Sequence, residues 1–400
     1  MIWPANLPVI ALLRIIHEKQ ESIGFRWLNL SRRNFFLIIT CFQTVFYWLP
    51  GYIMPVLSAF SWICMISSNN AILGQLTGYN GLGMGSLVFN WKTLTQDLGS
   101  PVLVPRWAVN NLLIGFVIFI CLLIPAVYYS NVWNFQRMPI ATSLFFKPNG
   151  DILTRDLKGI ILNSNITAAD ITFDCTTVVT YYLVLGCFVA LVVHTILYHG
   201  TDLLQQFRTS LEKRENDIHC TLMSKYHEAP EWWYISVFVI AFVLSVLSCY
   251  YGHFMPWYYL FIVVPFAILT ILPTGIVEAK TSIPMSTLIA AQMLGAAIFD
   301  GNLIPTYTFM IYGYQLSVES KSLIRNIKFG HFMKISARTL FATQLLVTII
   351  SIIIKYSVTS HLLKTVKNLC DHTGPWACSR FDVQSIVIAT VGKQEKKRLW

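Results

Sequence analysis

No lysine, arginine, aspartate or glutamate occurs between residues 34 and 91. A water-facing surface of that length cannot be left without charge, so this stretch indicates a chain whose solvent is lipid. Each later apolar run is close to the roughly 17–25 residues that a spanning helix needs. These runs lie at about 107–130, 175–201, 233–252, 254–277, 281–299, 301–318 and 339–359. With two crossings in 34–91, the sequence predicts an all-α polytopic membrane protein of about nine transmembrane segments, and residues 1–400 form one transmembrane domain.

The composition excludes a soluble protein and a nucleic-acid-binding protein. Hydrophobic residues make up 55% of the chain and charged residues 12%, whereas a soluble globule carries about 25% charge. The formal net charge of +10 comes from lysines and arginines in short gaps between apolar runs. Basic residues placed there set membrane orientation, and they do not form the basic, aromatic-interleaved face that nucleic-acid binding requires. We therefore expect the lipid bilayer as a partner and no nucleic acid.

Prolines, glycines and amides interrupt the charge-free stretch. Pro50, Gly51 and Pro55 break its first half, and 67–87 is rich in asparagine, glutamine and glycine. Amide side chains and flexible backbone are tolerated at membrane depth only against protein or a water-filled cavity. The stretch thus predicts a path for a polar solute, with the candidate lining residues Asn69, Asn70, Gln75 and Tyr79.

The distribution of basic residues predicts the orientation. Most of them become cytosolic if the N-terminal segment is inside, which makes 202–232 a cytosolic loop and 319–338 a basic, amphipathic cytosolic connector. That connector is either held by anionic headgroups or acts as a gate or substrate attractor. The same orientation puts the glycosylation sequon at Asn165 outside. Cys370 and Cys378 are also outside, where they form a disulfide or stay as two free thiols.

Few ionisable residues are available for chemistry inside the membrane. Glu278 lies at the end of one apolar run, where it is either a carrier of protons or substrate amines, or a loop carboxylate beside Lys280. His194 and His199 are five residues apart, a spacing that does not put them on one helical face, so no metal site is expected. No catalytic or phosphate-loop motif is present, and the sequence predicts neither an enzyme nor a cofactor.

Five strings in the chain resemble the oligopeptide transporter family, in its peptide-transporting branch from fungi and plants. They occur in order from Met1 to about residue 391, and two of them, the loop ending in WWY and the GHFMK string, are specific. The strings are MIWPANL at 1–7, YWLPGYIMPVLSAFSWICMISSNN at 47–70, SNVWNFQRMPI at 130–140, DIHCTLMSKYHEAPEWWY at 217–234 and GHFMKISAR at 330–338.

The resemblance implies a plasma-membrane transporter that takes up peptides of about three to five residues, or glutathione-like solutes, together with protons. It implies a helical bundle with broken segments, as in many secondary transporters. The basic residues that the family motif keeps are Lys334 and Arg338. On this reading Glu278 would bind the terminal amine of the peptide or carry the proton.

The chain also departs from the family pattern. Members of the family are roughly twice as long, so this chain resembles a truncated member that lacks the N-terminal part and the C-terminal end. Ser336 and Ala337 replace two prolines. Leu288, Gln292 and Met310 replace polar or charged residues of related sequences. Two alternatives follow: a transport-incompetent relic or partial subunit that associates with a full-length paralogue, and a metal-chelate transporter of the sister branch.

Overall fold

The computed structural model describes most of the chain. The described residues are 3–17, 31–67, 69–78, 81–90, 95, 102–142, 146, 149–151, 172–208, 222–223, 225–299 and 302–366. Regular structure in these ranges is helical throughout, and the only β-type pairings in them are two isolated bridges, Phe60–Leu87 and Phe146–Thr172. The prediction of an all-α fold is confirmed.

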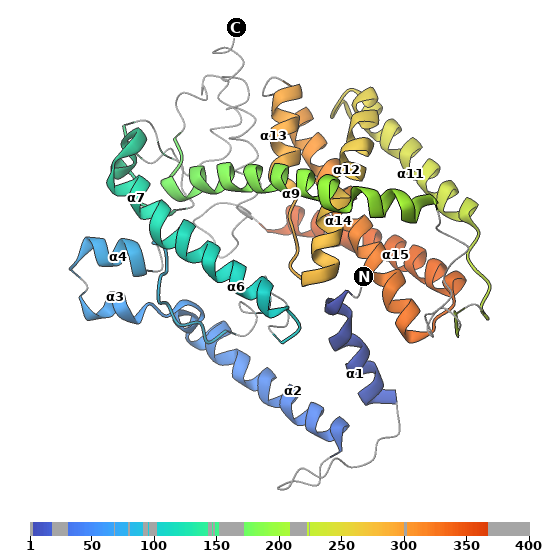
Figure 1. Ribbon diagram of the computed structural model, residues 1–400, viewed down its shortest axis with the longest axis horizontal. Helices are drawn as coiled ribbons and strands as arrows, with labels where there is room; N and C mark the ends of the chain where they lie inside the picture. Colours follow the sequence, from blue (N-terminus) through green and yellow to red (C-terminus); the bar gives the residue numbers. More distant parts are fainter. Residues whose placement is uncertain are drawn as a thin grey trace. The chain divides into compact units, whose positions relative to one another are not determined.

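The α-helices of the described residues carry the labels of Figure 1, and the gaps in the numbering are kept here. They are α1 (Leu7–His17), α2 (Arg32–Trp48), α3 (Trp62–Ile66), α4 (Ala71–Thr77), α6 (Arg106–Gly115), α7 (Ile124–Tyr129), α9 (Cys175–Arg208), α11 (Glu231–Gly252), α12 (Leu260–Thr281), α13 (Leu288–Ile298), α14 (Leu303–Met333) and α15 (Ala337–Thr365). Shorter turns of 3₁₀ or π type join several of them, such as the π turn Phe116–Leu123 that links α6 to α7.

Six helical segments are long and apolar enough to cross a membrane, which makes the chain a multi-pass membrane protein. They are Arg32–Ile53, Arg106–Tyr129, Cys175–Thr201, Glu231–Gly252, Trp257–Thr281 and Ala337–Thr365. Two further apolar helices, Pro4–His17 and Leu288–Ile298, are shorter than a full crossing. The described ranges therefore do not reach the predicted number of about nine.

The difference has three local causes. The stretch 34–91 gives one span and then the short helices α3 and α4, because the glycines and amides between them do not sustain a long helix. Residues 282–287 are not helical, so the run 281–299 is reduced to α13. The run 301–318 is the first half of α14, which is not apolar enough for a span because it carries tyrosine, threonine and glutamine side chains among its apolar residues.

The chain divides into two compact units, which are described separately. The first contains residues 1–142, 174–180 and 276–285, and the second contains 143–173, 181–275 and 286–400. In the first unit, the backbone N–H of Trp3 donates to the carbonyl of Ala279 across 3.1 Å, which attaches the start of α1 to the end of α12. The indole Nε1 of Trp62 donates to the carbonyl of Gly85 at 2.9 Å, closing the loop that carries α3 and α4.

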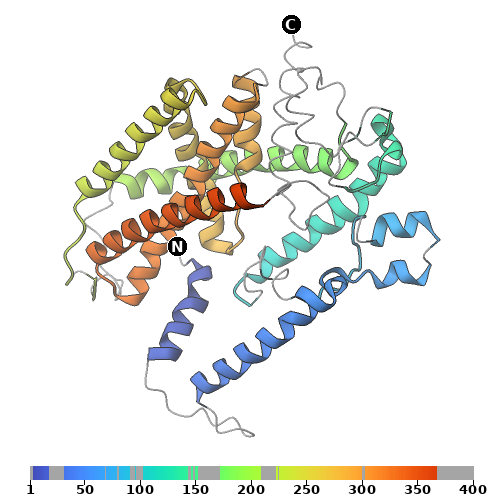
Figure 2. The ribbon, with the colours of Figure 1, turned by 180° about the vertical axis from the view of Figure 1, so that it is seen from behind.

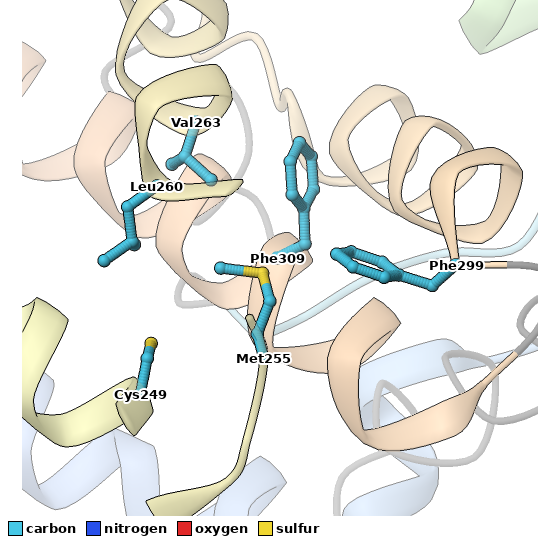
Figure 3. Packing of buried hydrophobic residues seen from close by; sticks show 6 residues of the cluster. All are labelled: Cys249, Met255, Leu260, Val263, Phe299 and Phe309. Atoms are coloured by element: carbon cyan, nitrogen blue, oxygen red, sulfur yellow. The ribbon is translucent and has the colours of Figure 1, made fainter. Parts of the chain in front are cut away.

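The second unit has its apolar core among α11, α12, α13 and α14. Figure 3 shows six buried side chains of this core, and the rings of Phe299 and Phe309 meet edge to face with centroids 6.1 Å apart. Helices α13 and α14 form a close antiparallel pair, visible from both sides in Figures 1 and 2. A Cβ at Gly295 would lie 3.1 Å from the carbonyl oxygen of Thr306, so glycine there permits the close approach.

Candidate functional site

The end of α12 combines a buried carboxylate with an interruption of the helix. Glu278 lies in the last turn of α12 and its side chain is only 8% exposed, so it is a helical, buried residue rather than a loop carboxylate. The backbone N–H of Ser282 donates to the carbonyl of Glu278 at 2.9 Å. Ser282 then adopts a left-handed conformation with φ of 62°, and the chain leaves the helix.

Two hydroxyl groups follow Glu278 at this helix end. The Oγ1 of Thr281 donates to the carbonyl of Val277 at 2.7 Å and accepts from the backbone N–H of Ile283 at 3.1 Å. The Oγ of Ser282 is buried and has no hydrogen-bond partner among the described residues. A buried hydroxyl without a partner costs about 1–3 kcal/mol, so an additional polar group at this position would be favourable. The α12 end is therefore a place where a polar ligand or water gains hydrogen bonds.

A second group of polar side chains lies between α12, α13 and α14. This polar seam consists of small hydroxyl residues and one amide, all buried, within helices that are otherwise apolar. Its members are Thr270, Thr274, Gln292, Thr306 and Ser317. Burial of such groups in a helix bundle is acceptable only when each is hydrogen-bonded.

The hydroxyl groups of the seam satisfy one another and the helix backbone. The Oγ atoms of Thr270 and Ser317 lie 2.9 Å apart, joining α12 to α14. Thr270 also lies 3.0 Å from the carbonyl of Ala267, and Ser317 lies 3.0 Å from that of Gly313. Each hydroxyl has one hydrogen to donate. If Thr270 donates to Ser317, Ser317 donates to the carbonyl of Gly313; if Ser317 donates to Thr270, Thr270 donates to the carbonyl of Ala267. The pair has two hydrogen-bonded arrangements of similar geometry.

Lys321 lies one helical turn beyond Ser317 on α14 and is only 6% exposed. Buried lysines are rare in any protein and expensive in a membrane, so they are normally paired and frequently functional. Lys321 belongs to the predicted basic, amphipathic connector 319–338, but its position on α14 aligns it with the buried face formed by Gly313 and Ser317. The sequence signal was the i, i+4 spacing of Gly313, Ser317 and Lys321, which a search for charges alone did not detect.

Gln75, one of the predicted lining residues, is part of a tyrosine network in the first unit. Its Nε2 donates to the Oη of Tyr128 at 3.2 Å, and the Oη of Tyr129 donates to its Oε1 at 3.0 Å. Tyr128 in turn donates to the carbonyl of Met138 at 2.9 Å. The amide therefore connects α4 to the end of α7.

The other predicted lining residues do not join Gln75. Asn70 is the N-cap of α4, and its Oδ1 accepts from the backbone N–H groups of Ile72 and Leu73 at 3.1 and 3.3 Å. Asn69 is exposed, and Tyr79 lies outside the described residues. The contacts described for Asn70 and Gln75 do not include Glu278, so these candidates do not gather into one site.

The two specific strings of the sequence meet in the second unit. Lys334 ends α14 in a left-handed conformation with φ of 60°, and its N–H donates to the carbonyl of Gly330. Ser336 then caps α15 by accepting from the N–H of Thr339 at 3.3 Å. Arg338 donates from Nε to the carbonyl of Glu228 at 3.2 Å, in the loop that leads into the WWY sequence. The ring centroid of Phe341 lies 5.4 Å from that of Trp233 and 4.8 Å from that of Tyr234.

The remaining predicted positions lie partly outside the described residues and partly in α13 and α14. Asn165, Cys370 and Cys378 lie outside the described residues. Leu288 begins α13, while Gln292 and Met310 are buried in α13 and α14 at 2% and 5% exposure. Within the described ranges, no three histidine, cysteine, aspartate or glutamate side chains are close enough together to hold a metal ion.

Comparisons with known proteins identify the family. The family model described as "OPT oligopeptide transporter protein" matches residues 1–399. Oligopeptide transporter 1 of Arabidopsis thaliana is 30% identical over 98% of this chain and 54% of its own length. Oligopeptide transporter 5 is also 30% identical, over 94% and 52%, and oligopeptide transporter 3 is 28% identical, over 96% and 54%.

The chain spans about half the length of these curated relatives. No solved structure matches it. The family match runs through the α12 end, the polar seam and the Arg338 contact alike, because it covers nearly every residue of the chain. The chain belongs to the OPT oligopeptide transporter family.

Proposed function

We propose that this chain takes part in the uptake of small peptides of about three to five residues, or glutathione-like solutes, across the plasma membrane, with protons moving in the same direction. The proposal is supported by membership of the family and by relatives that are named oligopeptide transporters. Its substrates are a peptide and protons.

The observation that carries the proposal is the buried Glu278 at the point where α12 stops being helical. Ion and substrate sites of secondary transporters use interrupted helices, because the free backbone groups and exposed dipole ends there bind polar solutes. The ionised carboxylate binds the terminal ammonium of a peptide, whereas the protonated acid carries a proton. In this proposal Glu278 alternates between holding a proton and holding the peptide amine.

The neighbouring hydroxyl extends the same site. The Oγ of Ser282, which has no partner among the described residues, can donate to a peptide carbonyl or to a water that hydrates the carboxylate. Ser282 follows Glu278 by four residues and its N–H is bonded to the Glu278 carbonyl, so the two groups are held at one helix end. Together they offer a charge for the amine and a donor for the adjoining amide.

The test is uptake of a radiolabelled tetrapeptide by cells that express the chain, measured with and without a protonophore. We expect uptake that is lost with the protonophore and strongly reduced by Glu278→Gln. The matched control is Glu319→Gln, because Glu319 is exposed on α14 and its printed contact within the described part of the chain is with Gln315 in its own helix. Surface expression of both variants is measured in parallel. Uptake in Glu278→Gln equal to that in the control would refute the role of this carboxylate.

A second candidate function is that of a partial subunit. Helix α15 is a spanning helix with no buried residue, and α2 likewise buries none, so both leave most of their apolar surface for lipid or for further membrane helices. A full-length relative that co-purifies with this chain, combined with no uptake by the chain alone, would favour this function over independent transport.

A further inference from the structure

We propose that the turn between α11 and α12 forms a binding site for the phosphocholine headgroup of a membrane lipid. The site is a cleft of about 550 Å³ at this turn, here named the aromatic cleft. Its aromatic wall is made by Tyr250, Tyr251, His253, Phe254 and Trp257. The volume falls within the roughly 300–1,000 Å³ of small-molecule sites. This inference does not depend on the proposed transport function.

The position of the cleft along the chain puts it at a bilayer surface. Helix α11 has 22 residues, about 33 Å, and ends at Gly252, while the next spanning segment begins at Trp257. Two spans joined by a turn this short must have the turn at the boundary between hydrocarbon and water. The group most available there is a lipid headgroup.

The floor of the cleft is packed against the apolar core of the second unit. Cys249 and Met255 line it and are 1% and 3% exposed, because both belong to the packed cluster that also contains Phe299 and Phe309, as Figure 3 shows. Pro305, near the start of α14, closes one side. A concave surface with a fixed floor can select among ligands, whereas loose interfacial aromatics only contact lipid in general.

The wall suits a quaternary ammonium. The rings of Tyr250 and Tyr251 meet at 84° with centroids 5.4 Å apart, so they form a corner of two nearly perpendicular rings. Aromatic corners of this kind surround choline and methylated lysine through cation–π attraction. A quaternary ammonium has no N–H group to satisfy, so rings alone stabilise it.

The same chemistry disfavours a primary amine. The described residues that line the cleft carry no carboxylate, and aromatic rings do not accept the three N–H donors of an ethanolamine or of a peptide terminus as a carboxylate does. His253 supplies the remaining recognition, because one nitrogen of a neutral imidazole is a donor and can bind a phosphodiester oxygen. Phosphatidylcholine is thus the lipid that the wall and His253 fit together.

The experiment uses the full chain, purified in detergent, with dihexanoyl-phosphatidylcholine, -phosphatidylethanolamine and -phosphatidylglycerol as probes. Affinities are measured by native mass spectrometry. We expect phosphatidylcholine to bind most tightly. Tyr251→Ala and Trp257→Ala should each weaken it about fivefold, since one ring face contributes roughly 1 kcal/mol and 1.4 kcal/mol is tenfold.

The controls separate specific binding from general contact. Tyr356 in α15 is 75% exposed and Tyr251 is 76% exposed, so Tyr356→Ala removes an equally accessible ring outside the cleft and should leave the affinity unchanged. His253→Gly keeps the left-handed backbone at this position (φ 49°) and should weaken all three lipids alike. Equal affinity of the wild type for the three lipids, or an effect of Tyr356→Ala as large as that of Tyr251→Ala, would overturn the proposal.

Discussion

Arg338 donates from Nε to the backbone carbonyl of Glu228 across 3.2 Å, although 110 residues separate them. The bond ties the first turn of α15 to the loop before α11, and Phe341 packs on Trp233 one helical turn later. Arg338 and Glu228 belong to two of the strings that resemble the oligopeptide transporter family, 330–338 and 217–234. Their similarity to the family therefore has a structural basis, since the two strings hold each other in place.

Replacing Arg338 should loosen this loop selectively. Arg338→Ala removes a hydrogen bond of about 0.5–1.5 kcal/mol, and the value should be near the lower end because the side chain is exposed. Hydrogen exchange of the amides of 225–229 should become faster, while exchange in α12–α14 stays unchanged. Lys328→Ala is the control, because its ammonium lies over the ring of Phe332 in its own helix. Unchanged exchange at 225–229 would show that the bond does not order the loop.

The hydroxyl pair of the polar seam should show measurable coupling. Thr270→Val and Ser317→Ala each remove one hydroxyl, and the double variant removes both. In each single variant the hydroxyl that remains keeps its bond to the backbone of its own helix. We therefore expect a coupling energy of about 0.6 kcal/mol, which is typical of hydrogen bonds between membrane helices. Unfolding of the four proteins in detergent gives this value. Strict additivity would mean that the pair makes no net contribution between α12 and α14.

Substitution of two glycines by alanine should change the stability of the protein in opposite directions. At Gly295 a Cβ would lie 3.1 Å from the Thr306 carbonyl and 3.3 Å from Phe309, so Gly295→Ala must push α13 and α14 apart and destabilise the protein. At Gly275 no atom lies within 4 Å of a Cβ, so Gly275→Ala should stabilise α12 by up to about 1 kcal/mol. Thermal unfolding of both variants measures the difference. The same sign of change at both positions would contradict the packing described for α13 and α14.

Asp174 should make stability depend on pH. It precedes α9, is 3% exposed, and accepts from the backbone N–H of Thr177 at 3.1 Å as an N-cap. Burial raises the pKa of this carboxyl above its ordinary value, although the bonds from Thr177 partly oppose the rise. A raised pKa means that folding favours the protonated form. The stability that protonated Asp174 contributes is therefore complete below its unfolded-state pKa, and it is lost as the pH rises through its folded-state pKa.

Two substitutions at Asp174 separate charge from capping. Asp174→Asn keeps an acceptor for Thr177 and removes the ionisation, so stability should vary less with pH than in the wild type. Asp174→Ala loses the cap and should cost about 0.5–2 kcal/mol at every pH. The unfolding temperature across mildly acidic to neutral pH measures both effects. If the unfolding temperature of Asp174→Asn varied with pH as that of the wild type does, the pH dependence would belong to another group.

The sequence was sufficient for the helical membrane fold, because spans depend on length and hydropathy alone. It was misleading where a run of the right length is interrupted by backbone geometry, as at Ser282, whose left-handed conformation ends α12 inside an apolar stretch. Glu278 was recognised because a carboxylate in an apolar run is conspicuous. Thr270 and Ser317 were missed, since hydroxyl residues are common in membrane helices and their pairing depends on how two helices meet. Ser336, noted only as a departure from the family, proves to be the cap of α15.

The most direct test of peptide transport is uptake into proteoliposomes that contain only this chain, with a proton gradient directed inward. We expect a labelled tetrapeptide to accumulate above its external concentration and a protonophore to abolish the accumulation. We also expect Glu278→Gln to lower it at least about tenfold and Glu319→Gln to leave it unchanged. Such a loss corresponds to about 1.4 kcal/mol or more. Accumulation no greater than in liposomes without the protein, with the chain folded and inserted, would contradict it.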